Sequence, residues 1–135
     1  MRFISSFYFF SMETLNEIMK ELYYKKETFF VDMFGKIKSN QTTLYADRNN
    51  CKNRQHIEKW LAMNDLINIA CYLNKDWQPD WNNTKEDKFI ITLRDAQWHA
   101  QKVEQPTSFV YFKTKDIADQ AINIIGNDLL ETIFI

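Results

Sequence analysis

The sequence predicts an α+β protein of one domain, in which a three-stranded antiparallel meander packs against several α-helices. Apolar residues recur at helical spacing in three stretches, whereas residues 88–94 alternate between apolar and polar. The connections after that strand are short, as in a meander. A chain of 135 residues is long enough for one domain with a real core. We expect residues 1–135 to divide into a variable, helical and basic part, 1–56, and a core of helix, strands and helix, 57–135.

The first eleven residues are apolar apart from one arginine. This run is too short to span a bilayer and has no small-residue cleavage site, so we expect neither a membrane helix nor a signal peptide. An edge strand or an apolar arm on the core is one interpretation. The other is that Met12 is the natural start of the protein.

Residues 12–34 have the apolar spacing of a helix that ends at Gly35. Thr14 and Glu17 form a capping-box pattern at its start. A break near Lys26 is the alternative, because the residues that follow it favour a strand.

Residues 36–56 are the least regular and most basic part of the chain, with a short strand expected at 42–46. Five cations stand here against Asp47 alone: Lys36, Lys38, Arg48, Lys52 and Arg54. The plainer interpretation is a solvated loop, the usual fate of a polar segment. In the functional interpretation these five are the partner-binding residues and meet phosphates or an acidic protein surface.

Residues 57–81 carry the most regular apolar pattern. The helix must end before Pro79, because a residue that precedes proline avoids the α region, and Asn74 is the expected left-handed cap. Trp77 and Trp81 follow. We expect both indoles to be mainly core and to clamp the helix end onto the sheet. An exposed aromatic platform for a partner is the alternative.

The last third of the chain predicts strands and then helices. The strands are 88–94, 98–103 and 109–113, joined by turns at 95–96 and 104–107.

A helix should start after Thr114, a good N-cap, with Asp116 at the positive end of the helix dipole. Gly126 should end this helix, and Asn127 should cap a last short one.

The chain offers little chemistry. It has no glycine-rich phosphate loop, and its two histidines and two cysteines lack metal-ligand spacing or a nucleophile context. Two cysteines that form no recognisable disulfide framework are typical of reduced thiols in a cytosolic protein. A net charge of −1 draws the whole molecule toward neither DNA nor membrane. We therefore expect a non-enzyme without metal or cofactor.

Two segments carry a family resemblance: LNKDWQPDWNNTKEDKF at 73–89, and SFVYFKTKDIADQAINIIGNDLLETIF at 108–134. They resemble a group of small, mostly uncharacterised phage and prophage proteins. These share a helix ending in LN-x-x-W-x-P-D-W-x-N, a strand, an aromatic strand leading into F-K-[ST]-x-x-x-A, and a closing helix. The resemblance covers about residues 57–135; residues 1–56 do not fit it.

The resemblance implies a counter-defence protein, because phage proteins of this size are often inhibitors of host defence. It implies an anti-CRISPR protein that binds a host protein or ribonucleoprotein nuclease complex in the bacterial cytoplasm, such as a type VI-B RNA-guided RNA nuclease. The alternative is a phage accessory nucleic-acid-binding module. Phosphate binding is steeply salt-dependent, which distinguishes the two.

Overall fold

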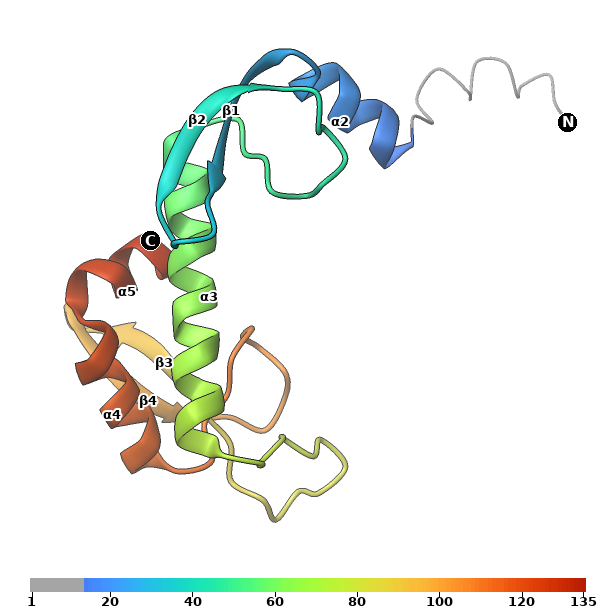
Figure 1. Cartoon of the computed structure of the whole chain (residues 1–135). Helices are drawn as coiled ribbons and strands as arrows, with labels where there is room; N and C mark the ends of the chain where they lie inside the picture. Colours follow the sequence, from blue (N-terminus) through green and yellow to red (C-terminus); the bar gives the residue numbers. More distant parts are fainter. Residues whose placement is uncertain (1–13) are drawn as a thin grey trace, which may run out of the picture. The chain divides into compact units, whose positions relative to one another are not determined.

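The computed structural model describes residues 14–135 and shows an α+β chain (Figure 1). These residues form four helices and two two-stranded antiparallel sheets. The chain divides into two compact units; the first ends at Glu58, and the second is Lys59–Ile135. The two interpretations of residues 1–11 lie outside the described residues.

The first unit begins with helix α2, Leu15–Tyr23, and the expected capping box is confirmed. The Thr14 hydroxyl accepts from the Glu17 N–H at 3.2 Å, and the Glu17 carboxylate accepts from the Thr14 N–H at 2.9 Å. A helix over 12–34 is wrong beyond Tyr23, because Tyr24 is already extended. The break near Lys26 is the alternative that the structure shows.

Strands β1, Lys26–Val31, and β2, Ile37–Thr42, form an antiparallel hairpin (Figure 1). In its register Phe30 pairs with Lys38. The expected strand at 42–46 is therefore wrong, since β2 ends where it should begin. Alternation gave no signal for β2 because most of its residues are exposed on both faces of the hairpin. A strand without a buried face needs no apolar residues at every second position.

The segment after β2 binds to the free edge of β1. Phe29 and Cys51 exchange backbone hydrogen bonds of 3.0 and 2.8 Å. The Asn49 side chain accepts from the Val31 N–H at 3.0 Å and donates to the Val31 carbonyl at 2.7 Å. A polar segment that the sequence presents as a loop is thus fixed by side-chain amides in place of a third strand.

Helix α3, Arg54–Asn74, buries one face, and the sequence pattern for its central part is confirmed. Strands β3, Phe89–Arg94, and β4, Gln97–Lys102, form the second hairpin, followed by helices α4, Lys115–Ile125, and α5, Asn127–Phe134. The core of the second unit combines buried residues from α3, β3, α4 and α5 with two from the segment between β4 and α4: Ala62, Leu66, Ala70, Ile91, Val110, Phe112, Ala118, Ala121, Ile125, Leu130 and Ile133.

The three-stranded meander is reduced to the β3–β4 hairpin and one additional residue pair. Phe89 and Phe112 exchange backbone hydrogen bonds of 3.0 and 2.9 Å. The neighbouring backbone groups, Tyr111 C=O and Lys113 N–H, lie on the opposite edge of this segment and bind the Asn74 side chain. A side chain from α3 therefore binds the edge of this segment that faces away from β3.

The helix caps at the C-terminal end are confirmed in part. The Thr114 hydroxyl accepts from the Ile117 N–H at 3.1 Å, as expected of an N-cap. Gly126 ends α4, but it also occupies the N-cap position of α5, so the assignment of Asn127 as that cap is wrong. The Asn127 side chain is used elsewhere and accepts from Trp98 Nε1 at 2.9 Å.

The turn between β3 and β4 generates a stability prediction. Asp95 and Ala96 have φ of 53° and 62°, positive at both central positions as in a type I′ turn. Because a Cβ is strained there, we expect Ala96→Gly to raise the free energy of unfolding by about 1 kcal/mol. Urea denaturation measures this. Ala100→Gly within β4 is the matched control and should lower stability; a loss of stability in Ala96→Gly would contradict the strain argument.

Candidate functional site

The five cations expected to bind a partner are all exposed and all belong to the first unit. Lys36 and Lys38 lie on the β2 side of β1. Arg48 and Lys52 lie on either side of the segment that binds the opposite edge of β1. Arg54 is the first residue of α3. The structure therefore places the five cations on both sides of β1 and at the start of α3.

Several of these cations already have contacts within their own unit. Lys38 Nζ lies 3.6 Å from the half-buried Asp32 carboxylate, and Arg54 lies 3.8 Å from the exposed carboxylate of Glu58. Arg48 donates to the Asn16 side chain at 3.3 Å, and Lys52 donates to the carbonyl of Leu22 at 3.3 Å. Exposed pairs of this kind are weak, so the charges stay available to a partner.

The hairpin tip, Asp32–Lys38, is fixed by its own hydrogen bonds. Asp32 Oδ1 accepts from the N–H groups of Phe34 and Lys36, both at 2.9 Å. The Asp32 N–H donates to the Lys36 carbonyl at 2.8 Å, and Gly35, at φ 77°, donates to the Asp32 carbonyl at 3.0 Å. The bond from the Lys36 N–H is the main reason why the pKa of Asp32 lies below its usual value.

Two large apolar side chains project from the hairpin tip. Met33 is 89% exposed and Phe34 is 78% exposed. The sequence pattern assigned Met33 to an apolar helix face, so the tip was missed. The signal that could have found it is the Asp-x-x-Gly spacing of Asp32 and Gly35, typical of a β-turn.

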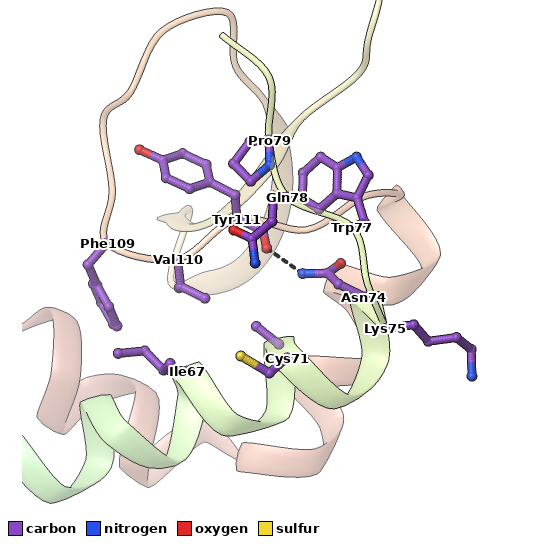
Figure 2. Close-up of a pocket in the computed structure, with 11 residues that line it drawn as sticks. Ile67, Cys71, Asn74, Lys75, Trp77, Gln78, Pro79, Phe109, Val110 and Tyr111 are labelled. Carbon is purple, nitrogen blue, oxygen red and sulfur yellow. Dashed lines mark hydrogen bonds between the residues drawn. The ribbon is translucent and has the colours of Figure 1, made fainter.

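A pocket of about 230 Å³ lies in the second unit, at the C-terminal end of α3 (Figure 2). It is lined by Ile67, Ala70, Cys71, Asn74, Lys75, Trp77, Gln78, Pro79, Phe109, Val110 and Tyr111. No carboxylate or imidazole is among these residues. The volume is below the roughly 300–1,000 Å³ of typical small-molecule sites.

Asn74 closes one side of this pocket. It is 8% exposed, donates from Nδ2 to the Tyr111 carbonyl at 2.8 Å (Figure 2), and accepts at Oδ1 from the Lys113 N–H at 2.9 Å. The assignment of Asn74 as a left-handed cap is wrong: it is the last residue of α3, and Lys75 has the positive φ, 57°. A side chain expected to end the helix therefore positions the segment before α4.

The polar groups that line the pocket are mostly satisfied. The Tyr111 hydroxyl accepts from the Ser108 N–H and donates to the Ser108 carbonyl, both at 2.7 Å. The Asn74 amide has both partners described above. The pocket therefore presents mainly apolar surface, with the exposed Cys71 thiol in its wall.

Trp77 and Trp81 are half-buried and neither belongs to the core, so the expectation that they clamp the helix onto the sheet is wrong. Trp77 Nε1 donates to the Glu86 carboxylate at 3.2 Å. Trp81 packs edge-on against Tyr111, and Lys88 Nζ lies 5.1 Å from the Trp81 ring centroid. The two indoles thus contact Glu86 and Lys88 of their own loop, between α3 and β3, and Tyr111 of the segment before α4.

A buried cation completes that loop. Lys88 is 3% exposed, donates to the carbonyls of Asn83 and Glu86, and lies 3.3 Å from the Glu86 carboxylate. Glu86 also accepts from the Asp80 N–H at 2.8 Å, and this bond is the main reason why its pKa lies below the usual value. Hydrogen bonding and charge together make Lys88 a structural residue.

Groups with metal or redox chemistry do not converge in the described part of the chain. No cluster of three or more potential metal ligands occurs over residues 14–135. His56 is exposed on α3 and His99 is half-buried on β4. Both cysteines are free, and burial raises the pKa of the Cys51 thiol. No helix in these residues is long and apolar enough to cross a membrane.

Comparison with protein-family models, with curated proteins and with solved structures finds no significant match for this chain.

The role of Asn74 generates a stability prediction. Asn74→Ala removes the side-chain partner of two backbone groups beside the core, the Tyr111 carbonyl and the Lys113 N–H. Each unsatisfied buried group costs about 1–3 kcal/mol. We expect the free energy of unfolding to fall by at least about 2 kcal/mol in chemical denaturation. Asn64→Ala, an exposed position on the same helix, is the control and should change stability by less than about 0.5 kcal/mol. Equal effects of the two variants would refute the role.

The lowered pKa of Glu86 generates a pH prediction. The ionised carboxylate stabilises the fold fully above its usual pKa of 4.5, and this contribution is lost as the pH falls through the lower folded-state pKa. Wild type should therefore exceed Glu86→Gln in unfolding free energy at neutral pH, and the difference should shrink below pH 4.5. Denaturation curves measured from about pH 3 to about pH 7, which spans the titration of carboxylates, test this. A difference that is constant with pH would contradict it.

Proposed function

We propose that the chain is a non-enzymatic counter-defence protein of the phage type, an anti-CRISPR-like inhibitor that binds a host nuclease complex in the bacterial cytoplasm. The observation that carries this proposal is the surface of the first unit, which exposes large apolar side chains beside its cations. Those side chains are Leu15, Ile18, Leu22, Tyr24, Met33, Phe34 and Leu44. Apolar side chains concentrated on an exposed surface mark sites of interaction with other proteins.

Helix α2 illustrates this surface. Leu15, Ile18 and Leu22 follow one another at spacings of three and four residues, so they lie on one face of the helix, and they are 57%, 40% and 38% exposed. Arg48 and Lys52 contact the same helix at Asn16 and Leu22. An amphipathic helix with an exposed apolar face is a common element that binds in the groove of a partner.

The non-enzymatic part of the proposal is supported by the pocket in the second unit. Its lining lacks a carboxylate and an imidazole, and its volume of about 230 Å³ is small for a substrate. General acid–base catalysis most often uses a histidine or a carboxylate within hydrogen-bond reach of the substrate.

The choice of a nuclease complex as the partner comes from the resemblance of residues 57–135 to phage proteins. A type VI-B RNA-guided RNA nuclease with its guide offers both protein surface and RNA phosphates. Either can complement the exposed cations of the first unit.

A phage accessory nucleic-acid-binding module is the second candidate, and one cluster favours it. Tyr24 is partly exposed, and Lys20 and Lys25 lie 5.8 and 5.3 Å from its ring centroid. Aromatic side chains beside cations are typical of single-stranded nucleic-acid binding.

The basic residues provide the test. We expect Lys36→Glu, Lys38→Glu and Arg48→Glu together to slow association with a purified type VI-B nuclease–guide complex about tenfold at low salt, since charge complementarity acts mainly on the on-rate. The difference should shrink at high salt. Lys59→Glu, Lys75→Glu and Lys85→Glu together change the net charge equally at exposed positions of the second unit and serve as the control.

Two results would overturn this proposal. Equal association rates of the triple variant and wild type at low salt, with intact circular dichroism, would make the charges a solvated surface. Tight binding to the protein-free guide RNA, with an affinity that falls steeply with salt, would instead favour the nucleic-acid-binding module.

A further inference from the structure

We propose that the hairpin tip is a preformed anchor, which inserts Met33 and Phe34 into an apolar pocket rimmed by carboxylates on a protein partner. This inference rests on the proposed function, because it names the chemistry of the partner surface that the inhibitor would contact. Three properties of the tip carry it: exposure, internal order and charge.

The tip exposes two large apolar side chains to solvent. Met33 and Phe34 are adjacent and are 89% and 78% exposed, so both side chains project from the β1–β2 hairpin. Large apolar side chains of this kind supply much of the binding energy when they fill a pocket on a partner. Methionine adds an unbranched, polarisable side chain that adapts to irregular apolar pockets.

The internal order of the tip lowers the entropic cost of binding. Asp32 holds the backbone of Phe34 and Lys36 through Oδ1, and its main chain bonds to both Gly35 and Lys36. The backbone that presents Met33 and Phe34 is thus fixed before a partner arrives. Preorganised loops lose less conformational freedom on association, so more of the contact energy appears as affinity.

The charge of the tip selects the rim of the partner pocket. Lys36 is exposed and forms no ion pair within residues 14–135, and Lys38, 57% exposed at its side chain, has only the pair with Asp32 at 3.6 Å. One oxygen of that carboxylate is already bound to backbone N–H groups. Two lysines that follow an apolar projection complement carboxylates at the rim of an apolar pocket.

A protein partner fits these observations better than a membrane or RNA. Recognition of anionic lipids typically uses clusters of roughly four to eight cations, whereas the tip has two. Single-stranded RNA is held by aromatic rings that stack on bases, but the more exposed residue of the pair is Met33, which has no ring.

The test uses the full chain with ¹³C-methyl methionine and observes the Met33 methyl resonance by NMR. The probe is a peptide of two antiparallel helices, with leucines lining the groove between the helices and glutamates along the rim of that groove. We expect a saturable shift of the Met33 resonance. Phe34→Ala, and separately Lys36→Glu with Lys38→Glu, should weaken the affinity at least about tenfold, or 1.4 kcal/mol. Tyr72→Ala removes an exposed side chain of the second unit and should leave the affinity unchanged.

Asp32→Ala separates internal order from composition, because it loosens the turn and keeps Met33 and Phe34. We expect it to weaken peptide binding as well. A peptide with lysine in place of glutamate should not shift the resonance of the wild-type chain.

Four results would overturn the inference. Two concern the peptides: no shift with the leucine–glutamate peptide, or an equal shift with the lysine peptide. The third is a shift that only phosphatidylserine vesicles or oligouridine cause, and the fourth is a shift that depends on the concentration of the chain itself, which would identify a second copy as the occupant. The nuclease complex is absent from this experiment. A tip that binds the acidic peptide in a chain that ignores the nuclease complex would refute only the proposed function. Unchanged nuclease binding in Phe34→Ala would refute only the anchor.

Discussion

The two hydrogen bonds of the Asn74 side chain are the interaction on which the second unit depends. One amide group from the last residue of α3 binds the carbonyl of Tyr111 and the N–H of Lys113, while Phe112 between them pairs with Phe89. The segment before α4 is therefore held from both sides, by a side chain and by a strand. This arrangement places Phe112 in the core and Tyr111 in the wall of the pocket. Buried backbone groups must find partners, and here a helix residue supplies them.

In the first unit, too, polar side chains supply hydrogen-bond partners for backbone groups. Asn49 binds both backbone groups of Val31, and Asp32 binds the backbone of the hairpin tip. Side-chain oxygens and amides thus order segments that have few apolar residues to bury. Because local hydrogen bonds fix these segments, Met33 and Phe34 can remain exposed on a defined backbone.

The distribution of polar chemistry separates structural from binding surfaces. Glu86, Lys88, Trp77 and Trp81 satisfy one another around a loop, so their charges and ring faces are largely used within the fold. The exposed lysines of the hairpin tip are used far less. A surface that combines exposed apolar side chains with charges left largely unpaired within the fold is suited to binding a partner. The proposals above therefore concern the first unit.

The sequence by itself determined the features that depend on neighbours along the chain. The capping box at Thr14, the N-cap at Thr114, the apolar face of α3 and the turn at Asp95 and Ala96 could all be predicted, because each is set by residues within a few positions of one another. Tertiary structure decided the rest. The strand Ile37–Thr42 is defined by pairing with β1, the segment before α4 is bound on its outer edge by Asn74 from 37 residues away, and the five cations lie on both sides of β1 and at the start of α3. Hydrogen bonds between residues distant in the sequence leave no periodic pattern, so these features could be found only in three dimensions.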